Sequence, residues 1–333
     1  MSAQNSFWEG KRVLVTGGAG FIGSHLVEAL SQSNAELSVV DSFENGSQSN
    51  IESALGNVEL IKGDLRDFDR CLDACKDVEI VLNLAAKVAG VAYNSKHPAD
   101  MFRTNLKIGM NMLEAARLCE VERFLNVSSA CVYRRDSPVP TTEDEAFVGD
   151  PEPSNLGYGW AKRVLELQAR LYSQEYGMQV VNVRPFNSYG PRDHFDVEAG
   201  HVIPSLIKKI TDGNNPLIVW GDGSQTRSFI YVEDTVRGMM LATERSMAEP
   251  INIGSPEEIS IANLARLIIS LTNSKTQVRF DTSRPSGQPR RCPDVTRAKS
   301  GLGFEAAVSL TEGLRKTINW YATDMNRVPI KAI

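Results

Sequence analysis

A glycine-rich turn between an apolar strand and a helix constrains the fold of this 333-residue chain more than any other feature. The segment Thr16-Gly17-Gly18-Ala19-Gly20-Phe21-Ile22-Gly23 follows the apolar run 12–16 and begins the helical pattern 21–30. A second apolar run, 37–41, ends in Asp41. This order of strand, turn, helix and strand predicts a parallel sheet covered by helices on both faces.

The same turn is suited to bind a dinucleotide. Glycines at 17, 20 and 23 let the backbone approach a pyrophosphate, and the helix N-terminus offers free N–H groups and the positive end of its dipole. The Asp41 carboxylate would accept hydrogen bonds from the ribose hydroxyls and repel a 2′-phosphate, which favours NAD over NADP.

Strand-like and helix-like segments continue to alternate up to Pro185, after which prolines and glycines separate shorter elements. We predict an α/β fold with a Rossmann-type doubly wound parallel sheet in an NAD-binding domain over 1–185. A smaller C-terminal α/β domain over 186–333 is expected to bind the substrate, and segment 229–254 is expected to return to the first domain. The further strands are predicted over 58–62, 80–84, 123–128, 180–184 and 251–253, and the further helices over 98–119, 156–176 and 232–245.

Composition excludes several classes of protein. The formal net charge is −5 and no long run of one sign occurs, so neither nucleic acid nor an anionic membrane is expected as a partner. No apolar run reaches the ~18–20 residues that span a bilayer. Five cysteines, an odd number, make no disulfide framework, and Cys71 and Cys75 are expected to be packing residues. We therefore expect a cytoplasmic protein without a metal.

A tyrosine and a lysine four residues apart, Tyr158 and Lys162, lie on one face of the predicted helix 156–176. The ammonium and the positive nicotinamide would lower the pKa of the phenol from its usual value of about 10. The phenolate could then accept a proton from a sugar hydroxyl while the hydride of that carbon passes to NAD. Ser129, at the end of a predicted strand, could bind the same oxygen.

Together these motifs resemble the extended short-chain dehydrogenase/reductase family, in particular its NAD-dependent nucleotide-sugar epimerases and dehydratases, over nearly the whole chain. Resemblance to GDP-L-fucose synthase is carried by Asn94 and by segments 85–91, 98–100, 190–195, 201–204, 287–291 and 294–296. Resemblance to GDP-mannose 3,5-epimerase is carried by segments 111–117, 128–133 and 220–229.

The resemblance implies roles for two further residues. Cys131, two residues after Ser129, corresponds to a cysteine that removes a proton beside a 4-keto group. His201, in the segment His201-Val202-Ile203-Pro204, corresponds to the histidine of GDP-L-fucose synthase that delivers a proton on the opposite face. GDP-mannose 3,5-epimerase has a lysine in that region, and this chain departs from it. The expected catalytic residues are Ser129, Cys131, Tyr158, Lys162 and His201.

The resemblance also implies two binding sites. The expected cofactor-binding residues are Gly17, Gly20, Phe21, Ile22, Gly23, Asp41, Asp64, Leu65, Ala85, Tyr158 and Lys162. The expected substrate-binding residues are Lys87, Asn94, Asn187, Val202, Trp220, Arg227 and Arg291. Arg284 and Arg290 remain alternatives to Arg291 at the diphosphate. Family members commonly form homodimers through two long helices, here 100–118 and 157–176, whose apolar residues could equally face the core: Met110, Leu113, Leu165 and Leu167.

The motifs leave several enzyme activities of this family as alternatives. Ala19 replaces an arginine of the NADPH-dependent GDP-L-fucose synthases, and Ala130-Cys131 replaces the Asp-Glu pair of the dehydratases. We therefore predict an NAD-dependent epimerase that acts on a GDP-hexose at C3 and/or C5 through a transient 4-keto intermediate. The alternatives are a nucleotide-sugar C4-epimerase, a GDP-L-fucose synthase-like epimerase/reductase and a non-catalytic dinucleotide sensor.

Overall fold

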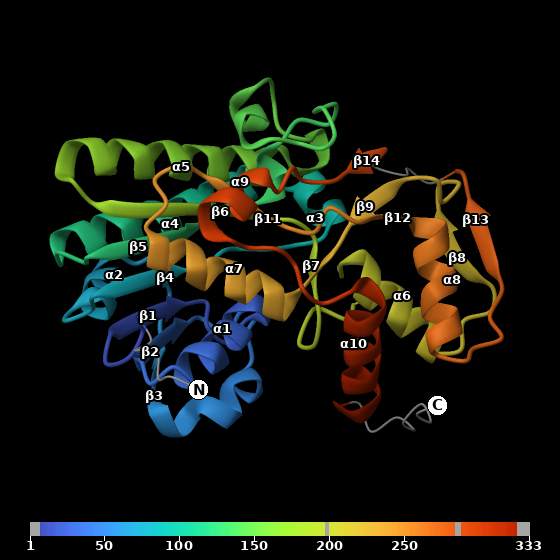
Figure 1. Cartoon of the computed structure of the whole chain (residues 1–333), viewed down its shortest axis with the longest axis horizontal. Helices are drawn as coiled ribbons and strands as arrows, with labels where there is room; N and C mark the ends of the chain where they lie inside the picture. The colour runs from blue at the N-terminus through green and yellow to red at the C-terminus, as the bar shows by residue number, and fades with distance from the viewer. Residues whose placement is uncertain (1–6, 197–199, 284–287, 325–333) are drawn as a thin grey trace.

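The computed structural model describes residues 7–196, 200–283 and 288–324. A seven-stranded sheet, in the order β11-β6-β5-β4-β1-β2-β3, forms its centre (Figure 1). Every neighbouring pair in this sheet is parallel, which confirms the predicted Rossmann-type fold. The strands are β1 (Arg12–Thr16), β2 (Glu36–Asp41), β3 (Val58–Lys62), β4 (Ile80–Asn83), β5 (Arg123–Val127), β6 (Gln179–Pro185) and β11 (Ile251–Ile253).

Helices cover both faces of the sheet because successive strand residues point to opposite sides. In β1, Val13 and Val15 enter one hydrophobic core, whereas Leu14 enters the other. The first core is covered by α1 (Phe21–Ser31), α7 (Val232–Arg245) and α9 (Thr296–Leu302). The second core is covered by α2 (Phe68–Cys75), α4 (Pro98–Leu118) and α5 (Leu156–Tyr176), and it buries Cys71 and Cys75.

The long helices α4 and α5 pack against each other within the chain. A Cβ at Gly109 of α4 would lie 2.4 Å from the Leu165 side chain of α5, so the two helices are in close contact there. Leu113 and Leu165 are buried at 3% and 4% exposure, which removes both from the candidate dimer surface. Met110 and Leu167 remain exposed.

A second, smaller group of elements lies at the right of Figure 1 and has a hydrophobic core of its own. Its helices are α6 (Val202–Thr211), α8 (Ile261–Leu271) and α10 (Leu310–Asp324). Two short strand pairs are parallel: β7 (Ser188–Tyr189) with β10 (Ile230–Tyr231), and β8 (Leu217–Trp220) with β13 (Val278–Asp281). A three-stranded sheet has β9 (Thr226–Ser228) between β12 (Glu258–Ser260) and β14 (Arg290–Arg291).

The chain returns to the central sheet after entering the smaller part. Helix α7 packs on the first core and β11 pairs with β6 at the sheet edge. Helix α9, from the segment assigned to the substrate domain, also packs on the first core through Ala298 and Leu302, a return that the sequence analysis did not anticipate. We keep 1–185 and 186–333 as a proposed division, with 229–254 and α9 added to the first part.

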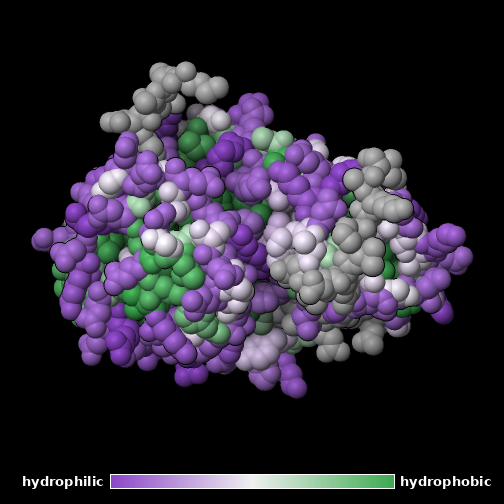
Figure 2. Space-filling model, turned by 90° about the horizontal axis from the view of Figure 1, so that it is seen from below, coloured by the Kyte–Doolittle hydropathy of each residue, from purple (hydrophilic) through white to green (hydrophobic). Residues whose placement is uncertain are grey.

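The surface is consistent with the charged and polar composition. The face shown in Figure 2 is mostly hydrophilic, with hydrophobic side chains gathered mainly over the half that bears the sheet. Within the described ranges, no helix combines the length and the apolar character needed to cross a membrane.

Candidate active site

The glycine turn after β1 needs glycine because three backbone segments approach closely there. Gly17 has a positive φ of 66°, and a Cβ on it would lie 3.0 Å from the backbone of Ala85. A Cβ on Gly23 would lie 2.2 Å from the Gly17 carbonyl oxygen. No side chain caps the N-terminus of α1 at Gly20, so the first N–H groups of this described helix can receive a pyrophosphate.

Asp41 ends β2 beside this turn. Its buried carboxylate accepts hydrogen bonds from the backbone N–H groups of Ala19 (3.0 Å) and Phe43 (2.8 Å). A 2′-phosphate at this ribose position would therefore face a carboxylate. This geometry supports the sequence-based choice of NAD.

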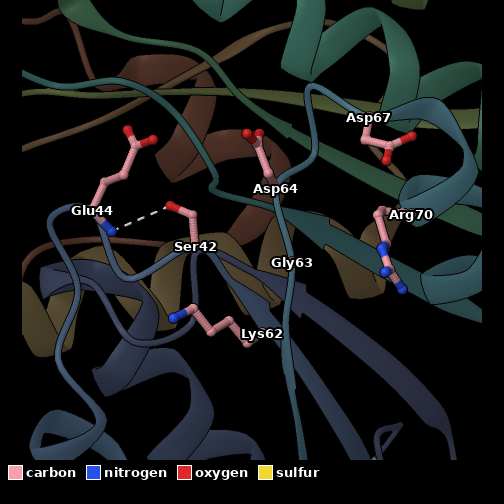
Figure 3. A pocket seen from close by; sticks show the side chains of 7 residues that line it. All are labelled: Ser42, Glu44, Lys62, Gly63, Asp64, Asp67 and Arg70. Carbon is pink, nitrogen blue, oxygen red and sulfur yellow. Dashed lines mark hydrogen bonds between the residues drawn. The ribbon is translucent and has the colours of Figure 1, made fainter.

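A cavity of about 470 Å³ lies beyond Asp41, at the ends of β2 and β3 (Figure 3). Asp64 is in its wall, and its ion pair with Arg66 (2.6 Å) lowers the pKa of the Asp64 carboxyl. The Leu65 side chain is buried beneath the site, and its carbonyl oxygen accepts a hydrogen bond from Asn111. The remaining lining residues, which the sequence analysis did not single out, are Ser42, Glu44, Lys62, Gly63, Asp67 and Arg70.

Ala85 lies on the other side of the glycine turn, after β4. Its N–H donates to the Thr16 hydroxyl (3.0 Å), which in turn donates to Asn83 (2.7 Å). These bonds join the ends of β1 and β4 and keep Ala85 against Gly17. The backbone of Ala85 is thereby held against the glycine turn, at the position expected for the nicotinamide half.

Four of the expected catalytic residues lie together where the segment after β5 meets the start of α5. The Lys162 ammonium is 5.6 Å from the centre of the Tyr158 ring and donates to the Val127 carbonyl oxygen (2.8 Å). The Ser129 hydroxyl is hydrogen-bonded to Tyr158 and accepts the backbone N–H of Cys131 (3.1 Å). Negative charge at Cys131 would act on both Tyr158 and Lys162.

The expected lowering of the Tyr158 pKa does not arise from the protein's own groups. Burial of the phenol raises its pKa, negative charge at Cys131 raises it further, and the Ser129 hydrogen bond only partly opposes both. Burial also lowers the pKa of Lys162 to about 8, which the negative charge of Glu166 partly counteracts. The expectation counted the lysine and nicotinamide charges and left out desolvation, which acts in the opposite direction. An oxidised nicotinamide would supply the positive charge that favours the phenolate.

Two glycines on either side of Tyr158 determine where it lies, and the sequence analysis did not identify them. A Cβ on Gly157 would lie 2.0 Å from the carbonyl oxygen of Pro98, at the start of α4. A Cβ on Gly159 would lie 2.4 Å from the carbonyl oxygen of Cys131. The first turn of α5 is thus in direct backbone contact with α4 and with the segment that carries Cys131.

A buried ion pair supports the lysine and was also missed. Glu166, one helical turn after Lys162, receives two hydrogen bonds from Arg184 of β6, and the shorter ion-pair distance is 2.6 Å. Both side chains are at most 2% exposed. Its spacing of four residues from Lys162 places Glu166 on the same face of the helix, and this spacing could have identified it from the sequence.

His201 directly precedes α6 in the smaller part of the molecule. Its Nδ1 lies 3.1 Å from an Asp193 carboxylate oxygen, and this negative charge raises the pKa of the imidazole. The side chain is 55% exposed. The described hydrogen bond of His201 is with Asp193, and that of Cys131 is with Ser129. No described contact therefore joins His201 to Cys131, the two residues expected to transfer protons.

Two arginines expected at the diphosphate are neighbours across paired strands. Arg227 of β9 is in register with Arg291 of β14. Burial and the like charge of Arg291 lower the pKa of Arg227 to about 10. Among the described residues, neither guanidinium forms an ion pair with a carboxylate, so the pair favours a bound anion.

Arg290 and Arg284 were the alternatives to Arg291 for binding the diphosphate. Arg290 precedes Arg291 on β14, so its side chain points to the opposite face, where it pairs with Glu258. Arg284 lies outside the described residues.

Three of the expected substrate residues are engaged within the protein. The Lys87 ammonium pairs with Asp100 (2.6 Å). Asn94, in α3 (Val91–Lys96), is buried and donates to Asn155 (2.8 Å). Asn187 has a positive φ of 39° and donates to the Ser228 carbonyl oxygen (2.8 Å).

The other two expected substrate residues are more accessible. Val202 begins α6 beside His201. Trp220, which ends β8, is 51% exposed. In the described part of the chain, no group of three or more His, Cys, Asp or Glu side chains could hold a metal ion.

Comparison with known proteins decides the family. Residues 13–254 match the NAD dependent epimerase/dehydratase family. The chain belongs to this family, and its cofactor is NAD. The resemblance to extended short-chain dehydrogenases/reductases noted from the sequence is thereby confirmed.

Relatives in this family are similar over their whole length. The chain is 33% identical to a dTDP-4-dehydro-6-deoxy-D-allose reductase from a Streptomyces species, over 94% of this chain and 97% of that protein. It is 32% identical to GDP-L-fucose synthase of Sinorhizobium fredii, over 95% and 97% of the two chains. The solved structure of UDP-glucose 4-epimerase from Thermotoga maritima, with UDP-glucose, is 30% identical with a TM-score of 0.86, over 94% and 99%.

Proposed function

We propose that this member of the NAD-dependent family is an epimerase that inverts C3 and/or C5 of a GDP-hexose through a transient 4-keto intermediate. The observation that carries the proposal is the place of Cys131, whose backbone N–H is bonded to Ser129 and whose charge would act on Tyr158 and Lys162. A thiol next to the hydride-transfer site can reach carbons beside the one that is oxidised.

The redox steps belong to Ser129, Tyr158 and Lys162. Tyr158 accepts the proton of the C4 hydroxyl, and Ser129 orients that oxygen. Bound NAD would supply a reversible acceptor for the C4 hydride, so the cycle would consume no reductant. The buried Lys162 stabilises the phenolate during this exchange.

The proton exchange is assigned to Cys131 and His201. A C–H bond beside the C4 ketone is acidified, so the Cys131 thiolate removes its proton and leaves an enolate. The His201 imidazolium, whose pKa the Asp193 charge raises, delivers a proton to the opposite face of the same carbon. Return of the hydride would restore the C4 alcohol, whose oxygen takes back the proton from Tyr158, and the neighbouring carbon would stay inverted.

The nucleotide diphosphate is assigned to Arg227 and Arg291, which are adjacent and lack carboxylate partners among the described residues. Guanidinium groups bind phosphate oxygens with two parallel hydrogen bonds. The preference for guanine rests on the resemblance to GDP-sugar enzymes and on the relative named GDP-L-fucose synthase.

Two other activities have specific support. Similarity to a UDP-glucose 4-epimerase favours a C4-epimerase, in which Cys131 would have no chemical role. Similarity to GDP-L-fucose synthase and to a dTDP-sugar reductase favours an epimerase/reductase that consumes a reduced cofactor. A non-catalytic sensor has no such support, because Ser129, Tyr158 and Lys162 are all present.

We also propose a homodimer formed through α4 and α5. The support is the set of large hydrophobic side chains that the fold leaves exposed on these two helices: Phe102, Met110, Leu118, Leu156, Trp160, Leu167, Leu171 and Tyr176. Light scattering should give twice the mass of 36.6 kDa. The variant Met110→Glu/Leu167→Glu should give the monomer mass.

The deciding experiment incubates the purified protein, without added cofactor, with GDP-, UDP- and dTDP-sugars in D2O. Deuterium at C3 or C5 supports the proposal and identifies the sugar. Product without deuterium indicates a C4-epimerase, and turnover only with added NADH or NADPH indicates a reductase. Cys131→Ser should lower deuterium incorporation at least about 100-fold. Cys119→Ser, which alters another partly buried thiol, should not.

A further inference from the structure

Glu152, on the loop that leads into α5, has a buried carboxylate with an unpartnered oxygen. The residue is 4% exposed. Its Oε1 accepts a hydrogen bond from the Ser154 hydroxyl (3.3 Å) and lies 3.9 Å from the Arg135 guanidinium. Its Oε2 is buried and has no hydrogen-bond partner among the described residues. Because burial of an unpartnered carboxylate oxygen is costly, a donor from outside the chain is expected there.

One end of this loop is fixed to the catalytic residues. A Cβ on Gly159 would lie 2.6 Å from the side chain of Pro151 and 2.4 Å from the Cys131 carbonyl oxygen. Pro151 therefore packs where α5 meets the Cys131 segment. The backbone N–H of Glu152 donates to the Tyr133 carbonyl oxygen (3.2 Å), which ties it to the same segment.

Other contacts connect Glu152 to the arginine pair. The Arg135 carbonyl oxygen accepts a hydrogen bond from the Gln288 amide (2.9 Å), and Gln288 accepts one from Arg291 (2.9 Å). The negative charge of Glu152 also raises the pKa of Arg227, against the effect of burial. Glu152 is thus linked both to the segment that carries Cys131 and to the arginines assigned to the diphosphate.

We propose that Glu152 accepts a hydrogen bond from a hydroxyl of the hexosyl group of a nucleotide sugar and thereby selects for that hydroxyl. This inference rests on the proposed function, which places a hexose between Tyr158 and a diphosphate at Arg227, near the segment that carries this carboxylate. An ionised carboxylate only accepts hydrogen bonds, so it suits a sugar hydroxyl. It repels a phosphate.

The competing explanation is that Glu152 only moderates the positive charge of Arg135, Arg227 and Arg291. The two explanations predict different changes in ligand affinity when the carboxylate is removed. A sugar contact affects the nucleotide sugar and spares the free nucleoside diphosphate. A charge effect changes the affinity for both.

The test measures dissociation constants of the full-length protein by calorimetry for three pairs: GDP-mannose and GDP, UDP-glucose and UDP, and dTDP-glucose and dTDP. For the pair that the wild type binds best, Glu152→Gln should weaken the sugar nucleotide by about 10-fold or more and change the nucleoside diphosphate by less than about 2-fold. Arg291→Gln should weaken both members.

Equal effects of Glu152→Gln on both members, or no effect on the sugar nucleotide, would overturn the proposal. So would a wild type that binds no sugar nucleotide more tightly than its nucleoside diphosphate. If Glu152→Gln unfolds, Glu152→Asp, which keeps the charge and withdraws the oxygens, should show the same selective loss. Deuterium incorporation is scored separately: selective binding without deuterium retains this sugar contact and overturns the proposed epimerisation.

Discussion

The Arg184 guanidinium and the Glu166 carboxylate form a buried, two-pronged ion pair, with nitrogen-to-oxygen distances of 2.9 and 2.6 Å. Glu166 also accepts a hydrogen bond from Ser128. The pair therefore joins β6, α5 and the residue after β5, and Glu166 supplies the negative charge that partly counteracts the effect of burial on Lys162. One structural interaction thus supports both the sheet and the catalytic lysine.

Removing one partner of this pair should strongly destabilise the fold. Arg184→Met leaves the Glu166 charge buried, so we expect the free energy of unfolding to fall by about 3–5 kcal/mol in urea denaturation. Arg290→Met breaks an exposed ion pair with Glu258 and should change it by less than about 1 kcal/mol. The double variant Arg184→Met/Glu166→Leu should recover much of the loss. If Arg184→Met and Arg290→Met lowered the free energy of unfolding equally, the prediction would be contradicted.

The pKa of Lys162 predicts a pH-dependent stability difference. The folded value of about 8 is below the usual 10.5, so the cost of the buried ammonium is fully present below pH 8 and disappears as the pH rises towards 10.5. The stability of Lys162→Met relative to the wild type should therefore fall by about 3 kcal/mol between pH 7 and 10.5. Urea denaturation at both pH values measures this. Lys275→Met, which alters an exposed lysine, serves as the control. If the stability difference between Lys162→Met and the wild type did not change with pH, the lowered pKa of Lys162 would be contradicted.

Asp193 should control the protonation of His201. Its carboxylate raises the pKa of the imidazole, so Asp193→Asn should lower that pKa in an NMR titration of the His201 Cε1–H signal. The stabilisation from this pair is fully present below the unfolded pKa of about 6.5 and is lost as the pH rises through the raised folded pKa. The signal is assigned with His201→Gln. An unchanged titration midpoint in Asp193→Asn would show that the two groups are not coupled in solution.

Gly157 should be intolerant of a single added methyl group. In Gly157→Ala the new Cβ would overlap the Pro98 carbonyl oxygen, so the first turn of α5 must move and carry Tyr158 with it. We expect kcat to fall about 100-fold, since a shift of 1 Å at a reacting group can cost that much. Gly56→Ala adds a methyl group in open space and should leave kcat unchanged. A normal kcat for Gly157→Ala would show that α5 can adjust there.

Arg290 and Arg291 should differ in nucleotide binding although they are adjacent. Arg291→Gln removes one member of the pair with Arg227 and should weaken GDP or UDP by about 10-fold or more. Arg290→Gln removes the partner of Glu258 and should change the affinity by less than about 2-fold. Calorimetry with the free nucleoside diphosphates measures both. The reverse order would place the diphosphate on the other face of β14.

The sequence predicted features that depend on local patterns. The bounds of β1, β3 and α5 agree with the expected ranges, and the glycine turn and Asp41 lie together as predicted. Features that depend on distant contacts were missed or wrong. Which of Arg290 and Arg291 faces Arg227 depends on the pairing of β14 with β9, and the effect of burial on the Tyr158 pKa depends on the packed site. Neither can be obtained from residue spacing.

The position of β11 has a consequence for synthesis of the chain. When residues 1–185 have left the ribosome, β6 is still an open edge, and the core face that α7 and α9 cover is exposed. The nucleotide-binding half is therefore completed only after Leu302 emerges. The segments that complete the sheet and its core follow most of the smaller part in the sequence, so the two halves should fold together. A nascent chain stalled near residue 185 should therefore need chaperone protection.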